Sequence, residues 1–188
     1  MVQTPSNMLA LGTRAPDFTL PEPATGNQVS LSDQRGKPVL VVFSCNHCPY
    51  VLHIIDAFVE LANNEQRQGL GVFMISANDV TGYPQDGPQQ MAEFARKHGF
   101  EFPYLYDESQ QVAKAYRAAC TPDFFLFDEQ HRLVYRGQFD SSRPGNSEPV
   151  NGADLSAAID AVFAGDDAPA EQIPSVGCNI KWRAGNEP

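Results

Sequence analysis

The chain has 188 residues, of which 42% are hydrophobic, and a formal net charge of −10. This length predicts one domain with a complete core and is too short for two full-sized domains. The apolar share is typical of a globular domain. The negative charge argues against nucleic acid or an anionic membrane as a partner, because binding to either depends largely on clustered Lys and Arg.

Nothing in the sequence suggests membrane insertion or export. No run approaches the roughly 18 apolar residues of a membrane span, and residues 1–11 lack the basic flank and apolar core of a signal peptide. We therefore expect a cytoplasmic protein. There, four cysteines are more often catalytic or metal-binding than structural, because thiols are kept reduced.

The first part of the chain predicts a small appendage to a larger fold. Residues 1–11 form an expected irregular arm. A short edge strand at 16–20 and a strand at 28–31 flank Gly26-Asn27, which is typical turn chemistry. We therefore expect an N-terminal β-hairpin extension.

The next stretch predicts a strand, a turn that carries two cysteines at residues 44–48 (the thiol turn), and a helix. Residues 39–43 are a continuous apolar, β-branched run, typical of a strand buried on both faces. Apolar residues then recur at three- and four-residue steps, which predicts an amphipathic helix beginning at Pro49. A second buried run at 70–77 follows, so the two strands should be parallel with a right-handed crossover.

The rest of the chain completes an α/β pattern. Residues 78–88 are a Gly-, Pro- and Asp-rich loop at the sheet end where such folds bind ligands, although a plain surface loop is an equal interpretation. The further predicted elements are a helix at 89–98, a strand at 102–106, a helix at 109–116, a hairpin with strands at 124–127 and 132–136, and a helix within 150–163. Residues 165–188 should form an irregular tail.

The thiol turn is the strongest chemical signal. Cys48 lies at the predicted helix start, where unpaired N–H groups and the helix dipole favour a thiolate. His47 either stabilises that thiolate or points to solvent. The C-x-x-C spacing of Cys45 and Cys48 beside a βαβ pattern predicts redox chemistry. Two thiols that pack as small hydrophobes are the alternative.

Several motifs resemble the peroxiredoxin-like branch of the thioredoxin superfamily, grouped with alkyl hydroperoxide reductase and thiol-specific antioxidant proteins. They lie at 15–20, 31–38, 106–116 and 121–128, and the Gly-Cys-Asn-Ile-Lys-Trp tail at 177–182 resembles one subgroup. The resemblance implies a single thioredoxin-like domain over residues 1–188, with a central mixed β-sheet flanked by helices. It also implies a thiol oxidoreductase with antioxidant activity that needs no organic cofactor.

The resemblance assigns the nucleophile. The first active cysteine of thioredoxins lies five positions after the aromatic residue that ends the strand, and this count from Phe43 reaches Cys48. Cys45 then stands where peroxiredoxins carry Thr, Val41 stands where a Pro would be expected, and no Arg occurs in 118–122. These departures argue against hydroperoxide reduction, and the Thr121-Pro122 pair favours thiol–disulfide exchange.

The resemblance also suggests the other site residues. Thr121-Pro122 matches the loop whose cis proline faces the nucleophile, so Pro122 should shape a groove for the substrate chain. Cys45 is the first choice to resolve an oxidised Cys48, followed by Cys178 and then Cys120. A filler role for Cys120 and no role for Cys178 stay open.

The competing hypothesis is that the protein is not an enzyme but a non-catalytic thioredoxin-like binding module. Its zinc ligands would be Cys45, His47 and Cys48 with Cys120 or Cys178, although usual zinc sites pair two separated ligand couples. The favoured hypothesis has no metal. It is a thiol-dependent oxidoreductase acting on a protein or small-molecule disulfide, with hydroperoxide as a less favoured substrate and a thiol as reductant.

Overall fold

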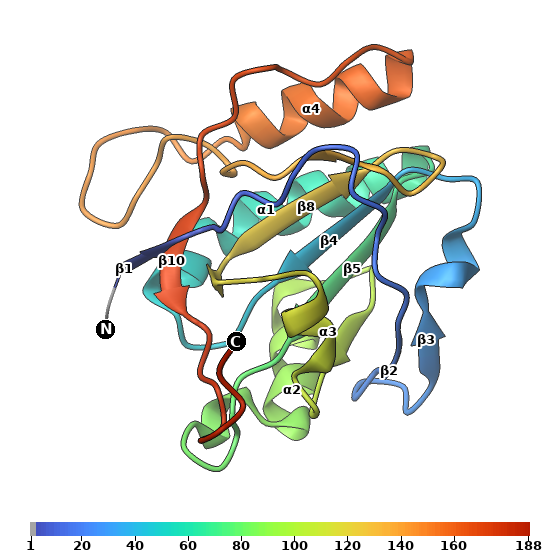
Figure 1. The fold of residues 1–188 in the computed structure, drawn as a ribbon. Helices are drawn as coiled ribbons and strands as arrows, with labels where there is room; N and C mark the ends of the chain where they lie inside the picture. The colour runs from blue at the N-terminus through green and yellow to red at the C-terminus, as the bar shows by residue number, and fades with distance from the viewer. Residues whose placement is uncertain (1–2) are drawn as a thin grey trace.

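The computed structural model describes residues 3–188 and places a five-stranded mixed sheet at the centre of the molecule (Figure 1). The strand order is β6-β5-β4-β8-β9. The strands are β4 (Val39–Phe43), β5 (Gly71–Ser76), β6 (Tyr104–Tyr106), β8 (Asp123–Phe127) and β9 (Leu133–Tyr135). β4 pairs parallel with β5, which confirms the predicted parallel unit. β8 pairs antiparallel with β4 on one side and with β9 on the other, and the β8–β9 pair confirms the predicted hairpin.

Helices cover both faces of this sheet. They are α1 (Pro49–Gln68), α2 (Pro88–His98), α3 (Gln111–Ala115) and α4 (Ala153–Ala164), with short 3₁₀ turns η1 (Leu31–Gln34) and η2 (Pro84–Asp86). α1 ends at Gly69, whose φ of 115° is a backbone conformation that glycine adopts at little cost. Among the described residues, no helix combines the length and apolar character that crossing a membrane requires.

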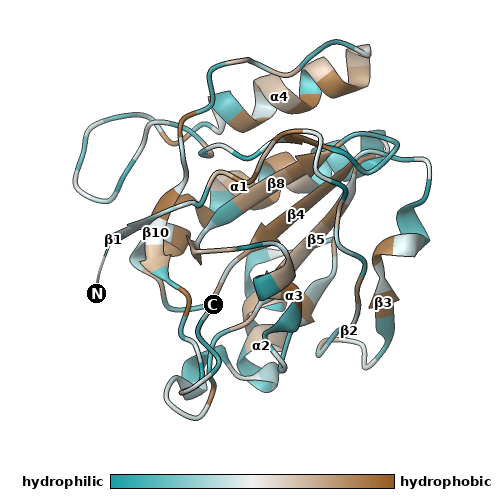
Figure 2. Ribbon diagram, in the orientation of Figure 1, coloured by the Kyte–Doolittle hydropathy of each residue, from teal (hydrophilic) through white to brown (hydrophobic). Residues whose placement is uncertain are grey.

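The core has two layers separated by β4. Leu40 and Val42 pack with residues of α1, α2 and α4, whereas Val41 and Phe43 pack on the opposite face with α3 and the N-terminal segments. Both faces of the strand are therefore buried, which explains its unbroken apolar sequence. The hydrophobic colouring of β4, β5 and β8 in Figure 2 shows this central position. Burial of one such Val, Leu or Phe side chain contributes on the order of 1.5–3 kcal/mol to the free energy of folding.

The predicted N-terminal hairpin is present. β2 (Thr19–Pro21) and β3 (Gln28–Ser30) pair antiparallel, and Gly26 in the connecting turn has a φ of 77°. The hairpin lies beside the main sheet in Figure 1.

The two ends of the chain are more ordered than the sequence predicts. A second, three-stranded sheet has the order β1-β10-β7 and joins β1 (Gln3–Pro5), β10 (Val176–Asn179) and β7 (Cys120–Thr121). The expected irregular arm and tail therefore each contain a strand, although residues 1–2 of the arm lie outside the described part of the chain. Local periodicity gives no sign of this sheet, because its strands come from distant parts of the sequence.

Candidate active site

Cys48 is the residue that caps the N-terminus of α1. The chain leaves β4 at Phe43, turns through residues 44–47 and enters the helix with Pro49 at its first turn. Pro suits this position because its missing N–H would have no partner there. The unpaired backbone donors of the first turn thus surround Cys48, as the sequence predicts, but its side chain is 0% exposed.

Three cysteines meet around Thr121. Cys48 Sγ lies 2.7 Å from Cys178 Sγ and donates to the Thr121 carbonyl oxygen at 3.1 Å. Cys45 Sγ lies 3.5 Å from the Thr121 hydroxyl. The loop before Pro122 and strand β10 therefore converge on the start of α1.

The surroundings of Cys48 favour its thiolate. A hydrogen bond from the Cys45 thiol is the largest cause that lowers the pKa of Cys48 to about 5, and Cys178 and the Val51 N–H add to it. Burial acts in the opposite direction. The Thr121 carbonyl can only accept a hydrogen bond, so it stabilises the protonated thiol. The donors prevail, which leaves a nucleophile that is charged at neutral pH.

The neighbouring thiols stay protonated. The pKa of Cys45 is raised well above its usual value, first by the hydrogen bond to Cys48 and then by burial and the negative charge of Asp86. Burial and the bond to Cys48 raise the pKa of Cys178 to about 12. One thiolate flanked by two thiol donors is an arrangement suited to thiol–disulfide exchange.

Cys120 and Pro122 flank Thr121 in the chain. The Thr121–Pro122 peptide bond is cis, as the resemblance implies. Cys120 is fully buried, and its Sγ lies 3.4 Å from the Pro122 carbonyl oxygen. Burial, and next the charge of Asp123, raise the pKa of the Cys120 thiol. Cys120 thus belongs to the same loop but faces a backbone carbonyl.

His47 is directed toward an acidic partner. Its Nδ1 lies 2.8 Å from Asp86 Oδ2, and its ring stacks on Tyr83 with centroids 5.4 Å apart. Asp86 is fully buried. When protonated, the imidazole neutralises this carboxylate. Of the two interpretations of His47 from the sequence, neither included this ion pair.

A polar network holds the Asp86 carboxylate in place. Oδ1 accepts the backbone N–H of Asn46, and Oδ2 accepts a hydrogen bond from the Asn78 side chain. The Tyr104 hydroxyl in turn donates to Asn46 Oδ1 at 3.0 Å. Sequence reasoning missed these residues individually. The available signal was the position of the 78–88 loop, which follows β5 and so lies at the same end of the sheet as the thiol turn.

The same cluster has the composition of a metal site. One ligand atom from each of Cys45, His47 and Asp86 lies within 4.8 Å of the others. This set supplies the sulfur, nitrogen and oxygen donors that zinc accepts. It differs from the set expected from the sequence, because a carboxylate takes the place of the second and third thiols.

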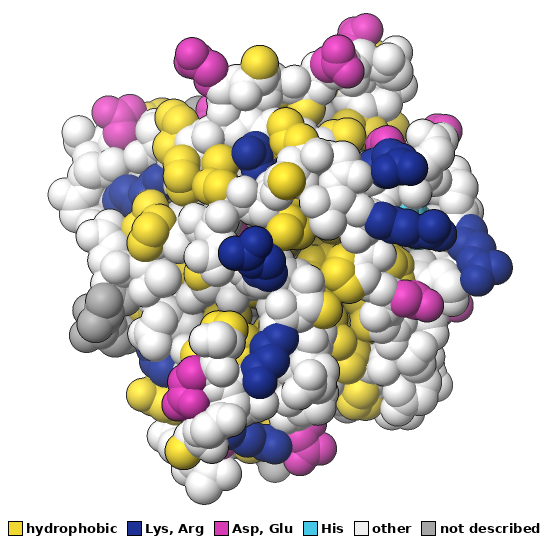
Figure 3. Space-filling model, in the orientation of Figure 1, with side chains coloured by type: hydrophobic (Ala, Val, Ile, Leu, Met, Phe, Trp, Pro, Cys, Tyr) yellow, Lys and Arg dark blue, Asp and Glu magenta, His cyan; other side chains and the backbone are white. Residues whose placement is uncertain are grey.

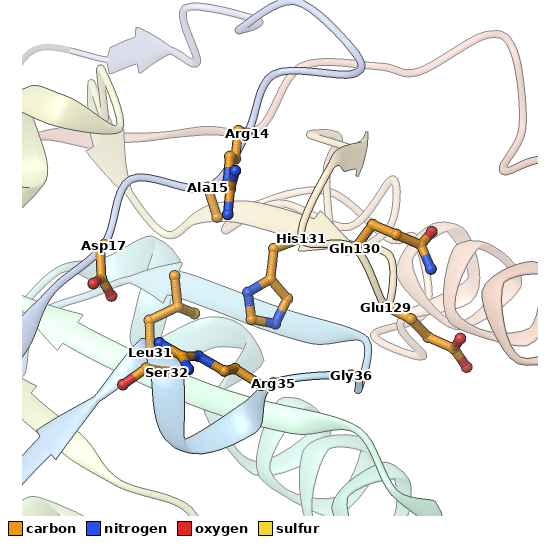
Figure 4. Close-up of a pocket in the computed structure, with 10 residues that line it drawn as sticks. All are labelled: Arg14, Ala15, Asp17, Leu31, Ser32, Arg35, Gly36, Glu129, Gln130 and His131. Carbon is orange, nitrogen blue, oxygen red and sulfur yellow. The ribbon is translucent and has the colours of Figure 1, made fainter.

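A separate hollow lies at the opposite end of β4. Basic side chains gather at the right of Figure 3, where η1 lies in Figure 1. A cavity of about 290 Å³ opens there between the segment before β2, the segment after η1 and the β8–β9 turn. Figure 4 shows Arg14, Arg35 and His131 around it. Because Arg35 precedes β4 and Cys48 follows it, this cavity is remote from the thiols.

Comparison with known families agrees with this geometry. The model of the AhpC/TSA family matches residues 11–136, which include β4, the thiol turn, α1 and the Thr121-Pro122 loop. The chain belongs to the AhpC/TSA family. Its two C-terminal elements, α4 and β10, lie outside the matched region of this family.

Curated relatives of this AhpC/TSA protein carry two kinds of name. A Mycobacterium tuberculosis protein named as a peroxiredoxin is 36% identical over 115 residues, which are 61% of this chain and 68% of the relative. The thiol-disulfide oxidoreductase ResA of Geobacillus thermodenitrificans is 29% identical over 130 residues, which are 69% of this chain and 70% of the relative. Both names describe thiol-dependent redox proteins, and together with the family they support that activity for this chain.

Solved structures extend the similarity over the whole fold. A hypothetical protein of Sinorhizobium meliloti is 50% identical, covers 97% of this chain and 100% of its own, and has a TM-score of 0.94. The thioredoxin domain of a Bacteroides vulgatus thiol-disulfide oxidoreductase is 23% identical, covers 68% of this chain and 88% of its own, and has a TM-score of 0.57. The second comparison shows the thioredoxin-like fold, which confirms the predicted fold class.

Proposed function

We propose that this AhpC/TSA protein is a thiol–disulfide oxidoreductase whose nucleophile is Cys48. The observation that carries the proposal is the contact of Cys48 Sγ with Cys178 Sγ at 2.7 Å, in surroundings that lower the pKa of Cys48 to about 5. A thiolate and a second thiol side by side are the two groups that complete exchange with an external disulfide.

The reaction has two exchange steps. The Cys48 thiolate attacks one sulfur of the substrate disulfide, so that a Cys48–substrate bond forms, the substrate S–S bond breaks and the other half leaves as a thiolate. A second cysteine of the protein then loses its proton and attacks Cys48 Sγ. This step forms an intramolecular disulfide and releases the second half of the substrate, which takes up the proton. An external dithiol reductant returns the protein to its starting state.

Cys178 is the better-placed group for the second step. Both thiols interact with Cys48, but in different ways: Cys178 Sγ lies 2.7 Å from Cys48 Sγ, and Cys45 is the hydrogen-bond donor that contributes most to stabilising the Cys48 thiolate. The sequence alone ranks Cys45 first. We favour Cys178 as the resolving thiol and Cys45 as the group that stabilises the attacking thiolate.

Hydroperoxide reduction is the second candidate reaction. The peroxiredoxin name of the mycobacterial relative favours it, and a thiolate at Cys48 is chemically able to attack a peroxide oxygen, giving a sulfenic acid and an alcohol or water. Cys178 would then condense with the sulfenic acid to the same disulfide, with release of water. The two reactions thus share their residues and differ in the first substrate.

The alternative to an enzyme is a non-catalytic zinc-binding module. The cluster of Cys45, His47 and Asp86 supports it, because three ligand atoms of suitable chemistry already lie together. Metal bound there would hold Cys45 as a thiolate and remove its hydrogen bond to Cys48. Metal loading and the exchange chemistry described above therefore exclude each other.

The decisive experiment compares disulfide reduction by the wild type and Cys48→Ser. We expect the reduced wild type to convert 2-hydroxyethyl disulfide to its thiol and Cys48→Ser to lose this activity by at least about a hundredfold, because no thiolate of lowered pKa remains. Cys120→Ser, which also removes one buried thiol, is the matched control for folding. Full activity in a folded Cys48→Ser protein would refute the assignment. Hydrogen peroxide in place of the disulfide tests the second candidate.

A further inference from the structure

Strand β10 covers the proposed nucleophile. Cys48 is 0% exposed and Cys178 only 3% exposed. β10 pairs antiparallel with β7, with Cys178 opposite Thr121 and Asn179 opposite Cys120. A disulfide too large to enter the protein interior therefore has no route to Cys48 Sγ while β10 is in place.

The attachment of β10 is local. It pairs with the two residues of β7 on one side and the three residues of β1 on the other. Of its four residues, Cys178 belongs to the buried core. Short pairings with little apolar burial are the parts of a fold that open first. The five-stranded sheet does not depend on them.

The chain on either side of β10 permits such an opening. Residues 165–174 form no helix or strand and connect α4 to β10 (Figure 1). Residues 165–171 are mostly exposed, whereas the Gln172 side chain donates to the Val134 carbonyl and the Ile173 carbonyl accepts the Gln138 N–H. After β10, Ile180 is buried and its N–H donates to the Ala119 carbonyl, while Lys181 bonds to Asn78. Residues 165–171 thus supply slack once the hydrogen bonds of residues 172–175 break, and the residues after β10 supply an anchor.

Gly177 of β10 lies directly against the backbone of Thr121 in β7. A Cβ atom at this position would lie 2.0 Å from the Thr121 carbonyl oxygen and 2.6 Å from its carbonyl carbon. Both are backbone atoms, which cannot move aside like the end of a side chain. In this register, the residue before the cysteine that faces Cys48 has to be glycine.

We propose that β10 occupies the place of the substrate strand, and that the substrate is an extended polypeptide segment in which glycine directly precedes the disulfide cysteine. Such a segment pairs with β7 after β10 lifts away, by β-strand addition, and its cysteine sulfur takes the position of Cys178 Sγ. The inference rests on the proposed exchange reaction and adds the class of its substrate.

The same movement in reverse completes the reaction. Once the substrate cysteine is bonded to Cys48, return of β10 brings Cys178 back to Cys48 Sγ. Cys178 gives up its proton and attacks, the Cys48–substrate bond breaks, and the released substrate cysteine takes up the proton. The tether keeps Cys178 at a high effective concentration, so the mixed disulfide is short-lived.

The test uses the tail sequence itself as a probe. The peptide Pro-Ser-Val-Gly-Cys-Asn-Ile-Lys-Trp, which is residues 174–182, is prepared as a mixed disulfide with nitrothiobenzoate. A second peptide carries alanine in place of the glycine. With the reduced full-length protein, we expect the glycine peptide to release nitrothiobenzoate at least about tenfold faster, because the alanine methyl group overlaps the Thr121 carbonyl. Glutathione, reacting with both peptides, corrects for their intrinsic reactivity.

The outcomes separate this inference from the proposed function. Equal rates for the two peptides, with normal reduction of 2-hydroxyethyl disulfide, would overturn the substrate class and leave the exchange reaction standing. Failure with all three disulfides would instead remove the proposed function.

A variant of the protein tests the displacement independently. Gly177→Ala should push β10 off β7 and raise the rate of Cys48 alkylation by iodoacetamide at least about tenfold, as located by mass spectrometry of the peptides. Gly82→Ala is the matched control, because its added Cβ meets only Asp79 Oδ2 at 3.5 Å. Unchanged protection of Cys48 in Gly177→Ala would contradict the proposal. The peptide comparison on the wild type decides the question if this variant does not fold.

Discussion

Cys48 Sγ and Cys178 Sγ lie 2.7 Å apart although 130 positions separate these residues in the chain. Cys48 ends the thiol turn at the start of α1, and Cys178 comes from the last strand, β10. The contact depends on the pairing of β10 with β7, which carries Cys178 across the loop before Pro122. The C-terminal segment is therefore part of the candidate active site.

The first prediction concerns which cysteines pair on oxidation. Mild oxidant should join Cys48 to Cys178, because their sulfur atoms need only a small movement to reach the about 2.05 Å of a disulfide bond. Peptide mapping of the oxidised, unreduced protein measures this directly. A dominant bond between Cys48 and Cys45 would restore Cys45 as the resolving thiol, as the sequence alone suggests.

The second prediction concerns the source of the low pKa of Cys48. Ultraviolet thiolate absorbance should show one cysteine titrating near a pKa of about 5 in the wild type. Cys45→Ala should raise this pKa, because the Cys45 thiol is its largest cause, and Cys45→Ser should raise it less, because a hydroxyl still donates. A Cys48 pKa near the ordinary value of about 8.5 in the wild type would contradict the electrostatic basis of the mechanism.

The third prediction concerns Asp123, a fully buried carboxyl at the start of β8 whose Oδ2 accepts the Ala119 N–H. Burial raises the pKa of Asp123 to about 7. Since the folded state then holds this proton more tightly than the unfolded chain, its contribution to stability falls as pH rises from about 4 to about 7, by up to about 4 kcal/mol.

Asp123→Asn should remove this loss. Urea unfolding of both proteins between pH 4.5 and 8 should show the free energy of unfolding of the variant gaining on that of the wild type as pH rises. The comparison is needed because Cys48 acts in the opposite direction: its pKa is lowered, so its contribution is present above about pH 8.5 and is lost as pH falls toward about 5. Parallel curves for the two proteins would show that Asp123 does not titrate in this range.

The fourth prediction concerns metal. Protein purified without chelators should contain well below one zinc per chain, and all four thiols should react with a thiol reagent after unfolding. Asp86→Asn should leave the metal content unchanged. Stoichiometric zinc in the wild type that Asp86→Asn removes would instead favour the binding module built on Cys45, His47 and Asp86.

The sequence by itself determined the central unit of the fold. The unbroken apolar run of β4, the thiol turn and the periodic helix α1 are contiguous, so hydrophobic periodicity and the preference of Pro49 for a helix start identify them without any distant partner. The position of Cys48 among unpaired N–H groups follows from the same local pattern. The motifs at 121–128 likewise indicated the Thr121-Pro122 loop and the hairpin that follows it.

Only the tertiary structure decided which groups surround Cys48. Strand β10 looks irregular in sequence because it is only four residues long and contains a glycine that is needed for its approach to Thr121. Its partners are also distant in the chain: β1 lies more than a hundred positions away, and β7 more than fifty. The ion pair of His47 with Asp86 is equally non-local. Periodicity reports how a segment packs on average, whereas contacts between distant segments depend on register and direction, which the three-dimensional fold alone sets.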